Sequence, residues 1–339
     1  MNDIINIELI EEFAKDIYCL LDKDNVFTTF YSVNGILFLV YPTKYFSIIF
    51  YDIINQIKIV EIKNAHKSYI IEFRHHLYKR KINDKRDLIL SVSEDNNIKI
   101  WDVNNIECIF NIFPYTKGQI NSSCFLYDNN KNELLIISSN FSDDTSDLES
   151  IKIFNLKGEE IKKINDSKYI TIYIDSFYDN KYQKNYIITA NKFSVISYDY
   201  EENKLYHNYT KEIFLYDCTS IIIYNKDRSK NEIIKIIYST GNGFIKIFDF
   251  HLGIFLYEIK INKGYIFSIC LLDEKYLFSC GKSYNIEINK INDENLDMQI
   301  IHINGETKVK IINHPIYGKC ILTKNLGGYN PIKLWKIKK

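Results

Sequence analysis

A short segment that ends on an aromatic residue followed by a polar one recurs along the whole chain. Its clearest copy is Ile98-Lys99-Ile100-Trp101-Asp102, which follows a polar turn. The aromatic position, or the residue that replaces it, falls at Tyr51, Trp101, Phe154, Tyr198, Phe248, Asn289 and Trp335. This spacing is close to the period of about 40–45 residues that one four-stranded unit of a radially repeated β-fold occupies. The pattern therefore predicts seven four-stranded units closed into one ring.

The repeat uses nearly the whole chain, so we expect one domain over residues 1–339, although this length would fit two average domains. The chain has 27 tyrosines, 21 phenylalanines and only four prolines, a composition that favours strands and bars few of them from a sheet ladder. Polar turn clusters separate four short strands, a to d from the centre outwards, in each repeat. We predict an all-β fold, a single seven-bladed β-propeller with its blades over residues 16–337.

The two ends of the chain are expected to meet in the last blade. The final repeat stops at its third strand, Ile332–Ile337, and lacks a fourth. The segment Asp16–Asp24 resembles the fourth strand of the second repeat, so we predict that an N-terminal strand at residues 16–21 completes blade seven and removes an exposed edge. Residues 1–15 would be an extension, with a short helix as the alternative. The helical spacing that supports this alternative involves Ile10, Phe13, Ile17 and Leu20.

The chain resembles the WD40-repeat β-propellers over residues 16–337, most clearly in its second and fifth repeats. The resemblance implies that His66 pairs with Asp95 in a structural tetrad. The network would continue through Ser91 or Ser93 to Trp101, and Ser93 is the serine that we assign to it. A buried indole and a buried imidazole both need partners, so these residues are interpreted as structural and not as a catalytic triad.

Basic residues gather in loops between the first and second strands of several blades, although the formal net charge is zero. The resemblance implies that a–b and c–d loops share one face of the ring. The residues of this candidate basic arc are Lys79, Arg80, Lys81, Lys85, Arg86, Lys184 and Arg228. An arc of this kind would bind nucleic acid or anionic lipid, which is the alternative function, whereas ordinary solvated lysines are the competing interpretation.

No motif in the sequence indicates catalysis, a cofactor or a metal site. His75 and His76 are adjacent in a strand and point to opposite faces, so they cannot chelate one ion together. Gly327 and Gly328 lack the strand–loop–helix frame of a phosphate site, and the acidic segment Asp143–Glu149 lacks the glycine of a calcium loop. We expect no enzymatic activity, no cofactor, no metal and no small-molecule substrate.

The resemblance implies a rigid platform for protein partners within a multiprotein complex. It places the usual docking site at the ring opening on the face of the d–a and b–c loops. Candidate contact residues in these loops are Tyr115, Lys117, Lys168, Tyr265, Glu306 and Tyr329. Tyrosine suits such a role because it offers a large contact area with a polar tip. The predicted function is a non-catalytic scaffold for protein–protein interactions.

Cysteine usage indicates the compartment. The seven cysteines are scattered, mostly in apolar segments, and form no Cys-x-x-Cys pair, which favours buried reduced thiols. No apolar run approaches the roughly 18 residues of a membrane span. The first residues also lack the positive charge of a leader peptide. We expect an intracellular protein, cytoplasmic or nuclear, without a transmembrane segment.

Overall fold

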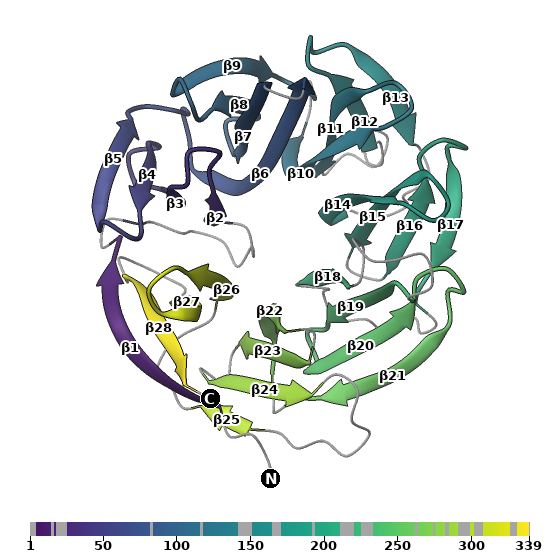
Figure 1. The fold of residues 1–339 in the computed structure, drawn as a ribbon. Coiled ribbons are helices and arrows are strands. Elements are labelled where there is room, and N and C mark those ends of the chain that lie inside the picture. The colour runs from purple at the N-terminus through teal and green to yellow at the C-terminus, as the bar shows by residue number, and fades with distance from the viewer. Residues whose placement is uncertain are drawn as a thin grey trace.

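Seven antiparallel sheets of four strands each are arranged around a central channel (Figure 1). The computed structural model describes residues 5–14, 17, 26–81, 84–115, 118–141, 151–164, 171–191, 194–210, 220–224, 233–261, 264–273, 275–281, 285–290, 299–301, 308–325 and 331–338. Within these residues every regular element is a β-strand, and none is a helix. The predicted all-β seven-bladed propeller is confirmed.

Six blades follow one another along the chain, each with its strands in sequence order from the channel outwards. Blade one holds β2 (Thr28–Tyr31), β3 (Leu37–Pro42), β4 (Ile48–Asp52) and β5 (Ile57–Ile62). Blade two holds β6 (Ile70–Lys81), β7 (Asp84–Ser93), β8 (Ile98–Asp102) and β9 (Glu107–Ile112). Blade three holds β10 (Gln119–Asp128), β11 (Glu133–Phe141), β12 (Ile151–Asn155) and β13 (Glu160–Ile164). Blade four holds β14 (Thr171–Asp179), β15 (Lys184–Asn191), β16 (Val195–Asp199) and β17 (Lys204–Asn208). Blade five holds β18 (Ile221–Tyr224), β19 (Lys235–Ser239), β20 (Phe244–Asp249) and β21 (Phe255–Lys260). Blade six holds β22 (Ile266–Leu272), β23 (Tyr276–Gly281), β24 (Ile286–Lys290) and β25 (Gln299–Ile301).

Blade seven is built from both ends of the chain. It holds β26 (Lys308–His314), β27 (Gly318–Lys324) and β28 (Ile332–Lys338), and its outer strand is β1 (Asn6–Phe13), which runs antiparallel to β28. The predicted closure by an N-terminal strand is confirmed, but the predicted position at 16–21 and the helical alternative for 1–15 are wrong. Of residues 16–21 the structure describes only Ile17, which forms an isolated bridge with Thr43.

The charges of β1 and β28 explain why the earlier segment makes this pairing. Glu8 lies opposite Lys336, and Glu12 lies opposite Lys333 in the ladder. The Glu8 carboxylate also forms an ion pair of 2.6 Å with Lys338. Opposite charges that face each other across strands stabilise one register over its neighbours. The ring is therefore closed by complementary strands from the two ends of the chain.

The hydrophobic core lies between the blades. Each of the seven repeated positions found in the sequence lies in the third strand of its blade, and the six aromatic ones pack in clusters shared with a neighbouring sheet. Ile89 and Trp101 of blade two, for example, share one buried cluster with Val40 and Phe50 of blade one. The second strands are almost entirely buried, as in β3 and β23, because both of their faces are covered.

Polar side chains on the first strands connect neighbouring blades around the channel. The Ser122 hydroxyl of β10 accepts a hydrogen bond of 3.2 Å from the Ile174 N–H of β14. The Ser268 hydroxyl of β22 accepts one of 3.3 Å from the Val309 N–H of β26. Both serines directly follow a β-bulge, a device that re-aims a side chain. The innermost strands are thus tied to one another as well as packed.

Candidate functional site

The histidine, aspartate and tryptophan of blade two form one connected hydrogen-bond network. The His66 ring contacts the Asp95 carboxylate through Nδ1 at 3.1 Å and the Ser91 hydroxyl through Nε2 at 2.8 Å. The Trp101 indole N–H donates to the same Ser91 hydroxyl at 2.9 Å. His66, Ser91 and Trp101 are all buried, so the network joins the loop before β6, the strand β7 and the strand β8 inside the protein.

The electrostatics of the network define its proton positions. Burial lowers the pKa of His66 below its ordinary value, which favours the neutral ring. Burial alone would raise the pKa of the Asp95 carboxyl, but hydrogen bonds from His66 and from the N–H groups of Lys67 and Asn97 hold it well below its usual range. A neutral His66 that donates from Nδ1 to Asp95 can accept the Ser91 proton at Nε2, so every member has a partner.

Ser91, and not Ser93, is the serine of this network. The Ser93 hydroxyl instead donates to the Ser68 carbonyl oxygen at 3.1 Å and accepts from the Asp95 N–H at 3.1 Å. The reason is the position of Trp101, which lies opposite Ile89 in the ladder, so that its indole reaches Ser91. Ser93 lies beyond that reach and holds the b–c turn.

Replacing Ser91 is expected to destabilise the protein more than replacing Ser93. Ser91→Ala leaves the Trp101 N–H and one His66 nitrogen buried without a partner, which costs about 1–3 kcal/mol for each group. Ser93→Ala should cost about 1 kcal/mol, the typical net contribution of one hydrogen bond. Urea unfolding followed by tryptophan fluorescence measures both variants, and equal losses would contradict the assignment of Ser91.

Blade seven carries a shorter version of the same arrangement. The Trp335 indole N–H donates to the Thr323 hydroxyl at 2.8 Å, and Trp335 lies opposite Ile321 in the ladder. Trp335, Thr323 and Ile321 thus repeat the arrangement of Trp101, Ser91 and Ile89 in blade two. In blades two and seven, the tryptophan of the third strand therefore donates to a hydroxyl group on the second strand. This hydroxyl lies two residues after the residue directly opposite the tryptophan.

A second buried network crosses blades two, three and four at the channel wall. One Glu72 carboxylate oxygen accepts from Arg74, with a closest approach of 2.8 Å, and the other accepts from the Ser122 hydroxyl and the Ser123 N–H, each at 2.9 Å. Arg74 also donates to the Ile174 carbonyl oxygen at 3.0 Å. Burial opposes the charge of Arg74, but Glu72 raises the pKa of its guanidinium above the ordinary value. This network fixes three first strands to one another.

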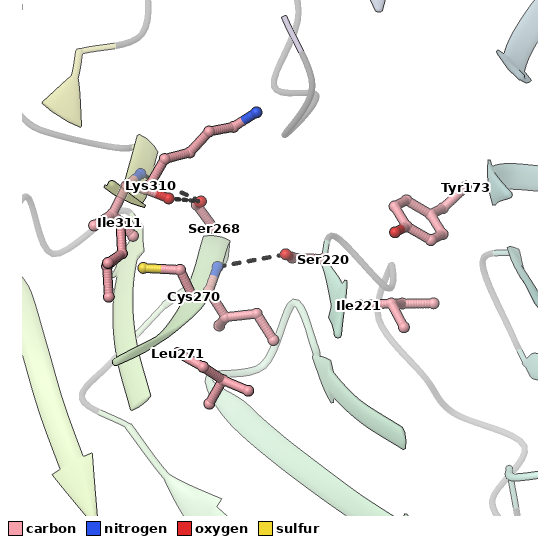
Figure 2. A pocket seen from close by; sticks show the side chains of 10 residues that line it. Tyr173, Ser220, Ile221, Ser268, Cys270, Leu271, Lys310 and Ile311 are labelled. Atoms are coloured by element: carbon pink, nitrogen blue, oxygen red, sulfur yellow. Dashed lines mark hydrogen bonds between the residues drawn. The ribbon is translucent and has the colours of Figure 1, made fainter. Parts of the chain in front are cut away.

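The channel wall also contains a cavity of about 270 Å³ between the first strands of blades four to seven. Figure 2 shows its lining, which combines hydroxyl groups with aliphatic side chains and one thiol. The Ser220 hydroxyl accepts from the Ile269 N–H at 3.4 Å, and the Lys310 ammonium donates to the Phe27 carbonyl oxygen at 2.6 Å. These polar groups of the wall are therefore engaged in joining blades.

The structure describes two of the six predicted contact residues on the d–a and b–c face. Tyr115 is buried, and its hydroxyl donates to the Ser138 carbonyl oxygen at 2.7 Å, so its assignment as an exposed contact residue is wrong. Burial also raises the pKa of Tyr115 well above its ordinary value. Tyr265 is half-buried and stacks on Phe267 with ring centroids 6.4 Å apart. Lys117, Lys168, Glu306 and Tyr329 lie outside the described residues.

Two exposed aromatic residues on that face were not among the predicted ones. Tyr45 lies in the b–c turn of blade one and is 66% exposed, and Phe113 follows β9 in a d–a loop and is 65% exposed. The Lys44 ammonium lies 4.8 Å from the centroid of the Tyr45 ring. Tyr45 could have been identified from the sequence, because a large aromatic residue stands inside a short polar turn, Thr43-Lys44-Tyr45.

The basic arc is partly neutralised by acidic residues of its own blades. Arg86 contacts the Asp102 carboxylate at 3.3 Å, and Lys184 contacts Asp199 at 2.7 Å and Glu202 at 2.5 Å. Lys79 and Lys85 are exposed and have no ion pair with any described residue. The side chains of Arg80 and Lys81, and all of Arg228, lie outside the described part of the chain. Among the described side chains of the arc, those of Lys79 and Lys85 in blade two therefore offer positive charge without an ion pair.

Two further histidines lie in ion pairs within the ring. His75 pairs with Asp87 at 2.8 Å and His251 with Asp179 at 2.7 Å. The five described cysteines are free thiols, and burial raises the pKa of Cys320 to about 11. Within the described ranges, no three histidine, cysteine or acidic side chains come together as metal ligands could, and no helix is long and apolar enough to cross a membrane.

Searches against models of known protein families and against curated proteins found no match to this chain.

Proposed function

We propose that this chain is a WD40-type propeller that serves as a non-catalytic scaffold for protein partners within a multiprotein complex. The observation that carries the proposal is the network of His66, Asp95, Ser91 and Trp101, whose residues and connections resemble the structural tetrad of that family. The His–Asp pairs support the non-catalytic part, since each one links strands or loops of the ring. A rigid ring that carries its loops on two faces is a suitable platform for binding.

The d–a and b–c face is the proposed docking face. Tyr45 and Phe113 are exposed there, and Tyr265 lies immediately before β22 at the rim of the channel. Exposed aromatic residues supply much of the binding free energy of many protein interfaces, because they bury a large area with few rotatable bonds. The surface therefore suits a protein partner.

The test is affinity purification of the tagged full-length chain from its own cells, at low and at high salt, with cross-linking mass spectrometry. We expect protein partners that survive high salt and cross-links at Lys44 and Lys67, which lie on this face. Tyr45→Asp together with Phe113→Asp should release them. The matched control is Leu252→Asp, a 65% exposed residue in a c–d turn on the other face.

Recovery of only nucleic acid or lipid, lost at high salt, would contradict the scaffold proposal. Turnover of a substrate by the purified protein would contradict its non-catalytic part.

A further inference from the structure

An exposed apolar strip crosses the a–b face of the ring, opposite the proposed docking face. It consists of Tyr31, Val33, Leu77 and Ile316, which are 44%, 39%, 40% and 68% exposed. These residues come from β2 and the turn that follows it, from β6, and from the turn after β26. Figure 1 shows that β26, β2 and β6 follow one another around the channel. The strip is therefore made by blades seven, one and two.

Hydrogen bonds join the segments that carry the strip. The Tyr31 hydroxyl donates to the Asn313 carbonyl oxygen at 2.7 Å, next to the turn that presents Ile316. The Val33 N–H donates to the Asp87 carboxylate at 2.6 Å, and Asp87 is the cross-strand partner of Leu77. These contacts connect blade one to both of its neighbours, so the four apolar side chains lie on adjoining segments of one face.

A projecting hairpin of blade two stands beside the strip. The pairing of β7 with β8 ends at Leu88 and Asp102, whereas the pairing of β6 with β7 continues to Lys81 and Asp84. The two strands thus extend about 13 Å beyond the third strand, at about 3.3 Å per residue. Leu77 and Lys79 are two residues apart in β6 and point to the same face of this ribbon. The ribbon forms a wall along the strip.

The wall carries positive charge that has no ionic partner among the described residues. Lys79 and Lys85 lie directly opposite each other in the ladder, and both are exposed. Like charges at directly opposed positions repel and destabilise the pairing. The nearest described carboxylate on this face of the ribbon is that of Asp87, which is fully buried and bound to His75 and the Val33 N–H. A negatively charged partner would remove the repulsion between the two lysines.

We propose that the strip and the wall together bind an acidic amphipathic segment of a partner protein. Its apolar side chains would cover Tyr31, Val33 and Ile316, while its carboxylates would contact Lys79 and Lys85. A nucleic acid would satisfy the lysines but would leave the apolar strip exposed, so the combination favours a protein. This second interaction surface goes beyond the proposed scaffold function and involves neither Tyr45 nor Phe113.

The test uses a displayed library of random 16-residue peptides, panned against the full-length chain and followed by fluorescence anisotropy with the best synthetic peptide. We expect enriched peptides to combine Asp or Glu with Leu, Ile, Phe or Trp. Ile316→Asp, and separately the pair Lys79→Glu and Lys85→Glu, should each weaken binding at least tenfold. Leu252→Asp and Lys157→Glu are matched controls, because both residues are exposed in c–d turns on the same face. These controls should bind normally.

A charge-swapped peptide, with lysine in place of each acidic residue, should bind the variant with two glutamates and not the unaltered chain. Melting temperatures and circular dichroism show that each variant is folded. Enriched peptides without acidic residues, or affinity that the lysine reversal does not change, would overturn the proposal. A 20-base-pair DNA duplex or phosphatidylserine vesicles that bind more tightly than the best peptide would also overturn it, if their binding depends on the two lysines and not on Ile316. That result would identify a polyanion site.

Discussion

Removal of residues 1–14 should lower the melting temperature by about 10 °C or more and make the chain prone to aggregation. The deletion removes β1, which pairs with β28 along seven registered residue pairs. Burying a side chain the size of Ile5 or Phe13 contributes about 1.5–3 kcal/mol each, and the ladder hydrogen bonds add to this loss. The deletion also exposes β28 as an unpaired edge with apolar neighbours, which is a template for aggregation.

A peptide that spans residues 5–14 provides the control for this experiment. Added in excess to the truncated chain, it should pair with β28 and restore part of the lost melting temperature, because it binds only the folded ring. Leu9→Lys in the full-length chain should have little effect, since the Leu9 side chain is exposed. A truncated protein that melts like the full-length chain would show that β1 does not hold the ring closed.

The position of β1 marks the limit of what local sequence patterns could predict. The third strands were found because an aromatic residue before a polar one is a local signal that recurs in six of the seven blades, and the spacing of these six located the remaining one at Asn289. The closing strand depends instead on a pairing between the two ends of the chain, and the similarity of Asp16–Asp24 to a fourth strand was accidental. A usable signal was present in the charges, since Glu8 and Glu12 match Lys336 and Lys333.

The network of blade two shows why a motif identified its members only in part. Ser91 and Ser93 are two residues apart in one strand, so both point to the same face of the sheet. Alternation could not distinguish them, and only the register of β7 against β8 brings Ser91 to the Trp101 indole. His66, Asp95 and Trp101 carried no such ambiguity, because each occurs once at its position in the motif.

Loop residues were predicted least well, because composition does not reveal which way a loop side chain points. Tyr115 and Phe113 are two residues apart in one d–a loop, yet Tyr115 is buried between blades and Phe113 is 65% exposed. The burial of Tyr115 goes with a hydrogen bond that its hydroxyl donates to the Ser138 carbonyl oxygen. The same limit applies to Lys184 of the basic arc, since the sequence could not show that it lies within reach of both Asp199 and Glu202.

Breaking the Glu72–Arg74 pair from the cationic side should destabilise the protein by about 3–5 kcal/mol, because Arg74→Met leaves a buried carboxylate without its charge partner. The Glu72 side chain is 4% exposed, so water cannot replace the lost guanidinium. Glu72→Gln should cost less, since an amide oxygen can still accept from the Ser123 N–H, and Arg74 retains the Ile174 carbonyl oxygen. The free energy of unfolding in urea measures both variants.

The combination of the two substitutions distinguishes a coupled buried pair from two independent contacts. With Glu72→Gln and Arg74→Met together, no charge is left uncompensated, so the loss should be smaller than the sum of the single losses by about 1–3 kcal/mol. Lys58→Met is the matched control, because Lys58 forms an ion pair of 2.9 Å with Glu61 and the two side chains are 51% and 26% exposed. An exposed pair of this kind contributes about 1 kcal/mol or less. Additive losses at Glu72 and Arg74 would show that the charges act separately, whereas coupling would show that one buried ion pair joins blades two, three and four at the channel wall.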